Sequence, residues 1–139
     1  TDHIRKLKRE RNFSRKEVID KWIEYSVELR NWCSSSFVHI CHLNRGLNDI
    51  QRIKYESETL HPTGDDVKDT GNLSEECDYL LTLFNPREEK YKLDSHFGND
   101  LNLYPNYRSI HLVESRDTEC PQHLFTQLIG GTKEFLEIF

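Results

Sequence analysis

The chain has 139 residues, 35% of them hydrophobic, and a formal net charge of −5, which fits one globular domain. It contains no run of about 18 apolar residues that could cross a bilayer and no secretory signal pattern, so we expect a cytoplasmic protein without a membrane contact. No methionine occurs, even at position 1, and we interpret the chain as part of a longer protein.

The first sixteen residues are basic, although the rest of the chain is acidic. They carry seven Lys and Arg against Asp2 and Glu10, a local balance of 7 − 2 = +5. Such a segment is typical of a nucleic-acid contact or of a solvated loop before a helix. Both interpretations stay open at this point.

A helix is predicted to begin at Ser14. Ser14 and Glu17 have the spacing of a capping box, in which each side chain accepts from the other residue's free backbone N–H. The helix should run to about residue 32. Apolar residues follow at spacings of 4, 3, 4 and 3, a single stripe that we expect to lie in the core: Val18, Trp22, Tyr25, Leu29 and Trp32.

The remaining elements are predicted from apolar runs and turn residues. Residues 37–41 and 79–84 read as buried strands, separated by a long polar loop at 44–66 and a short helix at 73–77. After a second polar stretch come three further strands, with Gly130 and Gly131 as a tight turn before the last one: residues 109–115, 123–129 and 134–139. The order predicts an α/β fold in which a parallel sheet is extended by antiparallel C-terminal strands.

Three segments resemble the RecA-type motor of DnaB-type hexameric replicative helicases, including phage helicase-primases. They are Cys41-His42-Leu43-Asn44-Arg45, then residues 66–78 (DVKDTGNLSEECD), and then Ile110 to Arg116 (IHLVESR). A weaker match, Thr1-Asp2-His3-Ile4, looks like the end of a Walker B strand. The resemblance implies that residues 1–139 are the C-terminal part of a RecA-like P-loop NTPase domain.

The resemblance also implies an ATP site shared between neighbouring subunits of a homo-hexameric ring. Asp2 would be the Walker B carboxylate that holds Mg²⁺ through water, His42 the sensor of the γ-phosphate, and Arg116 the arginine finger. Glu114 stands where the family has a second cation, and Arg108 is a candidate replacement. The sequence has no Gly-x-x-x-x-Gly-Lys-Ser/Thr phosphate loop, so we expect this chain alone to bind no ATP tightly and to hydrolyse none.

Residues 45–71 match the family's central loop, which would contact single-stranded DNA. Its candidate DNA-binding residues include four cations that could neutralise phosphates and a glycine that lets the backbone come close to the DNA, without any contact that reads bases. They are Arg45, Arg52, Lys54, Lys68, Thr70 and Gly71. The alternative for this segment is a solvated loop before an ordinary helix.

Three other functions compete with a helicase motor. One is another RecA-like ATPase or recombinase, because fold does not fix function. A second is a non-catalytic RecA-like domain that binds nucleic acid or acts as a scaffold. The third is a zinc or redox module built from Cys33, His39, Cys41 and His42, although His42 would point to the opposite face of the predicted strand. The four cysteines include no Cys-x-x-Cys pair, and we interpret them as reduced thiols.

Overall fold

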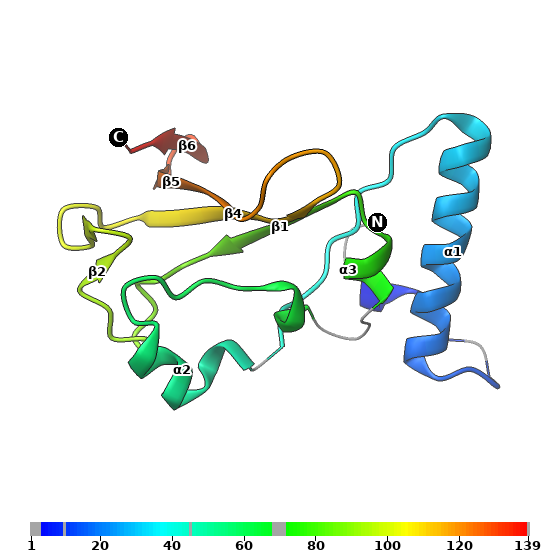
Figure 1. Ribbon diagram of the computed structural model, residues 1–139, viewed down its shortest axis with the longest axis horizontal. Helices are drawn as coiled ribbons and strands as arrows, with labels where there is room; N and C mark the ends of the chain where they lie inside the picture. The colour runs from blue at the N-terminus through cyan, green and yellow to red at the C-terminus, as the bar shows by residue number, and fades with distance from the viewer. Residues whose placement is uncertain (1–3, 10, 45, 68–71, 139) are drawn as a thin grey trace. The chain divides into compact units, whose positions relative to one another are not determined.

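The computed structural model describes residues 4–9, 11–44, 46–67 and 72–138 (Figure 1). The chain divides into two compact units. Unit 1 comprises Thr1–Asn44 and Gly64–Cys77, and unit 2 comprises Arg45–Thr63 and Asp78–Phe139. No helix in the described ranges is both long enough and apolar enough to cross a membrane.

Unit 1 is built around helix α1, which spans Arg15–Cys33 as predicted. The capping box is confirmed, since the Ser14 N–H donates to Glu17 Oε2 at 2.6 Å and the Glu17 N–H donates to Ser14 Oγ at 3.2 Å. The helix ends at Ser34, which adopts a left-handed conformation with φ of 50°. A left-handed residue at this position ends the helix because it directs the following residues out of the helical path.

The prediction of which helix face is buried was only partly right, because Trp22 packs against the core but is not among the fully buried residues. The buried residues of α1 are Ile19, Ile23 and Ser26, whereas Trp32 at the end of the predicted stripe is 83% exposed. Ile19 and Ile23 pack with Ile4 and with Leu73 of helix α3 (Asn72–Glu76). The helix carries two apolar stripes one residue apart, and the pattern alone does not say which one meets the core.

The strand predicted at residues 37–41 does not form among the described residues. This segment is extended but joins no ladder, and Val38 is largely exposed. Only isolated backbone contacts are present in this segment and directly after it. The Ile40 carbonyl accepts from the Ile4 N–H at 2.8 Å, and an isolated antiparallel bridge joins Leu43 to Val67. An apolar run becomes a strand only where a neighbouring strand satisfies its backbone groups.

Unit 2 contains a four-stranded sheet in the order β1-β4-β5-β6. The strands span Tyr79–Phe84, Tyr107–Ser115, Gln122–Ile129 and Glu134–Glu137. The four strands predicted in this unit are therefore confirmed to within two residues at each end. All the ladders are antiparallel, so the antiparallel part of the expected sheet is present and the parallel part is not shown.

The two faces of the sheet differ. One face is buried by Thr82 and Phe84 of β1 and by Ser109 and His111 of β4. On the other face the apolar side chains of β1 are open to solvent, and Leu81 is 65% exposed. Cross-strand partners share a face, and Leu81 is paired with Leu112.

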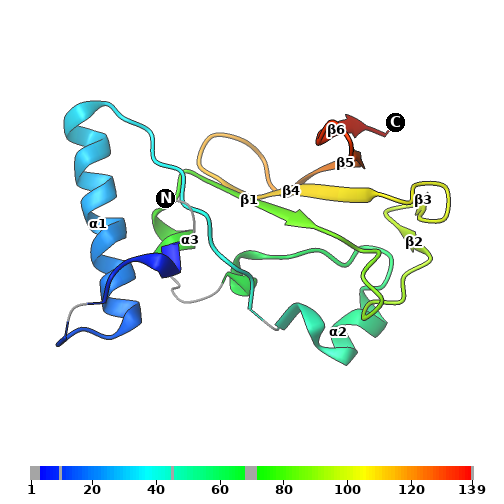
Figure 2. The same ribbon diagram turned by 180° about the vertical axis from the view of Figure 1, so that it is seen from behind.

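The predicted long loop at residues 44–66 contains regular structure. It holds the 3₁₀ turns η2 (Gly46–Asn48) and η3 (Gly64–Asp66) and the helix α2 (Ile50–Tyr55), whose first turn is capped by Asp49. In both views, α2 and the small hairpin of β2 (Ser95–His96) and β3 (Asn99–Asp100) lie toward the same end of the sheet (Figure 1 and Figure 2).

Candidate functional site

Unit 1 joins two of the motif segments at the base of the 45–71 loop. The Asn44 N–H donates to the Asp66 carbonyl at 2.6 Å, and Asn44 Nδ2 donates to the Asp65 carbonyl at 2.7 Å. Leu43 and Val67 form the adjoining bridge. The segment that carries His42 is thereby fixed beside the segment that leads into residues 68–71.

His42 itself has an exposed side chain in the extended segment just before this bridge. The position allows an imidazole nitrogen to donate to an incoming oxygen ligand. His42 belongs to unit 1, whereas Arg116 belongs to unit 2.

Arg116 directly follows the end of β4. Its N–H donates to the Asp78 carbonyl at 3.1 Å, and its Nη1 lies 3.4 Å from Asp78 Oδ1. Both side chains are accessible, at 50% and 40% exposure. The part of Asp78 in holding Arg116 follows from the pairing of Tyr79 with Ser115, which no local pattern specifies.

The suggested second cation does not lie beside Arg116. Arg108 is near the other end of β4, where its Nη1 donates to Asn85 Oδ1 at 2.9 Å. Eight residues of strand separate the two arginines by about 25 Å at ~3.3 Å per residue. Arg108 therefore cannot act on the same phosphate as Arg116 of the same chain.

The candidate DNA-binding residues fall partly outside the described ranges. Arg45, Lys68, Thr70 and Gly71 lie outside the described residues, as does Asp2. Arg52 Nε donates to Glu56 Oε2 at 3.1 Å and its Nη2 donates to the His61 carbonyl at 2.8 Å, which engages it within unit 2.

Lys54, on the same short helix as Arg52, is exposed. Of the two described candidates, it is the one placed to contact an external phosphate.

A cluster that sequence reasoning missed lies on the buried face of the sheet in unit 2. We call His61, His96, His111 and His123 the histidine cluster. His111 and His123 are paired across β4 and β5, and their Nδ1 atoms are 2.7 Å apart. The His61 ring centroid lies 4.9 Å from that of His111 and 5.0 Å from that of His123.

Hydrogen bonds define the state of His96. Its Nε2 lies 2.8 Å from the Leu60 carbonyl, which can only accept, so Nε2 carries a hydrogen. Its Nδ1 is 3.1 Å from the Tyr107 hydroxyl, which donates to it. Both ring nitrogens of a neutral His96 are thus satisfied inside the protein.

The surroundings of His96, His111 and His123 favour the neutral form of these rings. His96 and His111 have no exposed surface. Desolvation is the main cause that lowers the pKa of His96 to about 4 and that of His111 to about 3, and nearby histidines add to it. Burial also lowers the pKa of His123, since a charged ring is costly away from water.

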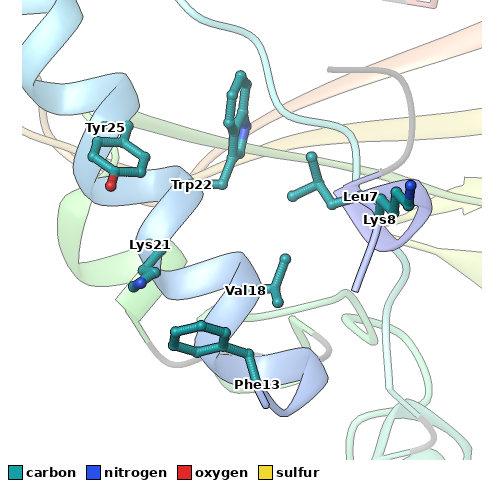
Figure 3. Close-up of a pocket in the computed structure, with 7 residues that line it drawn as sticks. All are labelled: Leu7, Lys8, Phe13, Val18, Lys21, Trp22 and Tyr25. Carbon is teal, nitrogen blue, oxygen red and sulfur yellow. The ribbon is translucent and has the colours of Figure 1, made fainter. Parts of the chain in front are cut away.

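A shallow pocket of about 230 Å³ opens beside α1 in unit 1. Its lining includes three aromatic rings, Phe13, Trp22 and Tyr25, and two lysines, Lys8 and Lys21 (Figure 3). Lys21 Nζ sits 4.0 Å from the centre of the Phe13 ring, a cation–π distance. Part of the basic N-terminal segment therefore lies next to the exposed aromatic side of the helix.

The zinc or redox alternative finds no geometric support. In the described part of the chain, no three or more His, Cys, Asp and Glu side chains gather as a metal site. The four cysteines, all within that part, are thiols and not disulfides.

Comparison with known proteins shows a similarity of fold and no match of sequence. No family model matches the chain, and no curated protein matches it either. Among solved structures, the fold is similar to that of a DnaB-like replicative helicase, studied with its interactions with primase, at a TM-score of 0.72 and 17% identity. The match covers 97% of this chain and 28% of that helicase chain. At this identity the similarity establishes the fold.

Proposed function

We propose that this chain is part of an ATP-driven ring helicase motor that moves along single-stranded DNA. The observation that carries the proposal is the similarity of nearly the whole chain to one part of a DnaB-like helicase. The three motif segments, found in the sequence by themselves, point to the same family. The rest of such a motor would supply the phosphate loop and the parallel strands of the sheet.

In the proposed motor, ATP would lie between one subunit and the next. Arg116 would reach the γ-phosphate of the neighbouring subunit's nucleotide, where a charged guanidinium stabilises the developing negative charge. Its weak tether to the accessible Asp78 suits a side chain that must exchange one anionic partner for another. Asp2 would hold Mg²⁺ through water on the chain's own nucleotide.

His42 would report the state of that nucleotide to the DNA loop. It precedes the bridge between Leu43 and Val67, and the Asn44 side chain ties the start of the loop to Asp65 within it. A hydrogen bond from His42 to the γ-phosphate, lost after hydrolysis, would alter the loop through this bridge. Lys54, Lys68 and Gly71 would meet the DNA backbone.

The test uses the longer protein with its phosphate loop. Arg116→Ala and His42→Ala should each abolish DNA-stimulated ATP hydrolysis, measured as phosphate release, and leave ring assembly intact by light scattering. Lys133→Ala, at an exposed turn, is the matched control and should hydrolyse normally. Normal rates in either site variant would remove the assigned role.

A DNA-binding measurement tests the loop. Lys68→Ala should weaken binding to an oligo-dT strand and lower the slope of log K against log salt by about 0.7, as expected for one phosphate contact on a single strand. An unchanged slope would contradict the contact. Unwinding of a forked duplex would separate the helicase from the other RecA-like ATPases and recombinases, which remain the alternative.

A further inference from the structure

The histidine cluster connects the sheet to a segment that is distant in sequence. Several contacts join residues 58–61 to the β2–β3 hairpin and to the sheet. The Phe97 N–H donates to the Glu58 carbonyl at 2.6 Å, His96 Nε2 donates to the Leu60 carbonyl at 2.8 Å, and the His61 ring packs on His111 and His123. Leu60 and Pro62 are fully buried next to these contacts.

The contact between His111 and His123 requires an unprotonated ring. One Nδ1 must donate and the other must accept across 2.7 Å, so the two rings cannot both be imidazolium ions. His111 Nε2 is also 2.8 Å from the hydroxyl of the buried Ser109, and a hydroxyl adapts to either tautomer. Protonating both partners would replace the hydrogen bond with two facing N–H groups and a like-charge contact.

We propose that the histidine cluster is an acid-sensitive latch that holds residues 58–61 against the sheet when it is neutral and releases them when it is protonated. The latch is a property of unit 2 and stands whether or not residues 45–71 contact DNA.

The groups that face the cluster come from each element packed around it. The loop contributes His61 and its Thr59 carbonyl partner at 2.8 Å, the β2–β3 hairpin contributes His96, and β5 contributes His123. Strand β4 contributes His111 and Tyr107, and burial raises the pKa of Tyr107, which keeps the hydroxyl neutral.

Positive charge on His61, His123 or His96 lowers the pKa of His111. Positive charge on His61 or His123 likewise lowers the pKa of His96. Each proton that enters therefore opposes the next one. Opening to water screens these charges, so the rings take up protons in the open state and not in the closed one.

The direction of the pH dependence follows from the lowered pKa values of the buried histidines. The pKa of a buried histidine lies below its value of about 6.5 in water, so the open state binds more protons and the closed state is favoured at neutral pH. The latch is stable above a pH of about 6.5, the pKa of a histidine in water, and it weakens as the pH falls below it. With pKa values of about 4 and about 3, opening from pH 7 to pH 5 becomes easier by about 20-fold for each of the two buried rings.

The experiment is amide hydrogen exchange on the 139-residue chain at pH 7 and pH 5, corrected for the intrinsic exchange rate. Protection of the Phe97 amide, whose N–H donates to the Glu58 carbonyl, should fall by several hundred-fold, on the order of 20 × 20 for two linked protons, while α1 stays protected. Trp22 and Trp32, both in α1, give a fluorescence check that unit 1 is intact. Equal protection at both pH values, or equal loss in α1, would overturn the latch.

Substitutions assign the effect to the cluster. His111→Asn keeps a polar side chain without a titrating ring and should reduce the pH-dependent loss of protection to about 20-fold, the share of one histidine. His39→Asn, in unit 1, is the control outside the cluster and should keep the wild-type pH dependence of protection at the latch. If His111→Asn loses the same protection as the wild type, the latch does not depend on this ring.

A measurement on the unaltered protein covers the case in which His111→Asn fails to fold. Histidine ring signals in NMR spectra should show His96 and His111 neutral down to pH 5 and then protonated in one step together with the loss of the amide signals of residues 58–61. Titration of either ring near its ordinary value, with those amides unaffected, would overturn the proposal.

Discussion

At the scale of single residues, the ion pair of Arg116 and Asp78 is weak, which is compatible with the role proposed for Arg116. The atoms are 3.4 Å apart and both side chains meet solvent, so the pair is screened and worth about 0–1 kcal/mol. Arg116 is thus held in place by its backbone while its guanidinium stays available.

We predict that Asp78→Asn lowers the free energy of unfolding by less than about 1 kcal/mol, because only a screened interaction is lost. Urea unfolding followed by circular dichroism gives the measurement, with Asp100→Asn in the exposed hairpin as a comparison. A loss above about 2 kcal/mol would mean that the pair is a structural tie, and the proposed finger role of Arg116 would then lose its support.

The buried hydroxyl of Tyr107 gives a second residue-scale prediction. It donates to His96 Nδ1 at 3.1 Å, and neither residue has exposed surface. Tyr107→Phe would leave that nitrogen without a donor, which should cost about 1–3 kcal/mol of stability. Denaturant unfolding of this variant and of Tyr104→Phe, a residue that keeps some solvent exposure, provides the comparison. Equal stability of the two variants would contradict the assigned tautomer.

At the scale of elements, α1 shows how local and tertiary information divide. Its start is set by Ser14 and Glu17, two residues in direct mutual contact, and the pattern of a capping box predicts it. Its buried face depends on Ile4 and Leu73, which approach from elsewhere in the chain. The predicted strand at residues 37–41 fails for the same reason, since a strand exists only through its neighbours.

Removing the cap should weaken this helix. We predict that Ser14→Ala destabilises unit 1 by about 1 kcal/mol, because the Glu17 N–H and the first turn lose their acceptor. Fluorescence of Trp22 and Trp32 during urea unfolding reports on α1 itself. Ser36→Ala, beyond the end of the helix, should leave the midpoint unchanged, and an unchanged midpoint in both variants would show that the cap contributes nothing.

At the scale of the whole molecule, the candidate catalytic residues are distributed over two units. His42 lies in unit 1 and Arg116 in unit 2, and the loop at residues 45–71 is divided between them. The chain spans 28% of the helicase chain whose fold it shares. The proposed motor activity would need a phosphate loop, which these 139 residues do not contain.

We predict that the 139-residue chain hydrolyses no ATP, with or without single-stranded DNA. The sequence holds no phosphate loop whose backbone N–H groups and lysine could bind the phosphates, so Arg116 has no nucleotide to act on. Phosphate release from chromatographically pure protein is the measurement, with the longer protein as the positive control. Turnover that co-purifies with the chain through successive columns would refute the assignment.

The sequence by itself determined the features that depend on neighbours along the chain. These are the capped start of α1, the four strands of unit 2 and the order of the motif segments, because capping and alternation act over a few residues. The histidine cluster could not be predicted in this way. His61, His96, His111 and His123 meet only through the register of β4 with β5 and the folding back of residues 58–61. Tertiary structure decided that register, the buried face of α1 and the tie between Asp78 and Arg116, since each depends on which distant backbone supplies a partner.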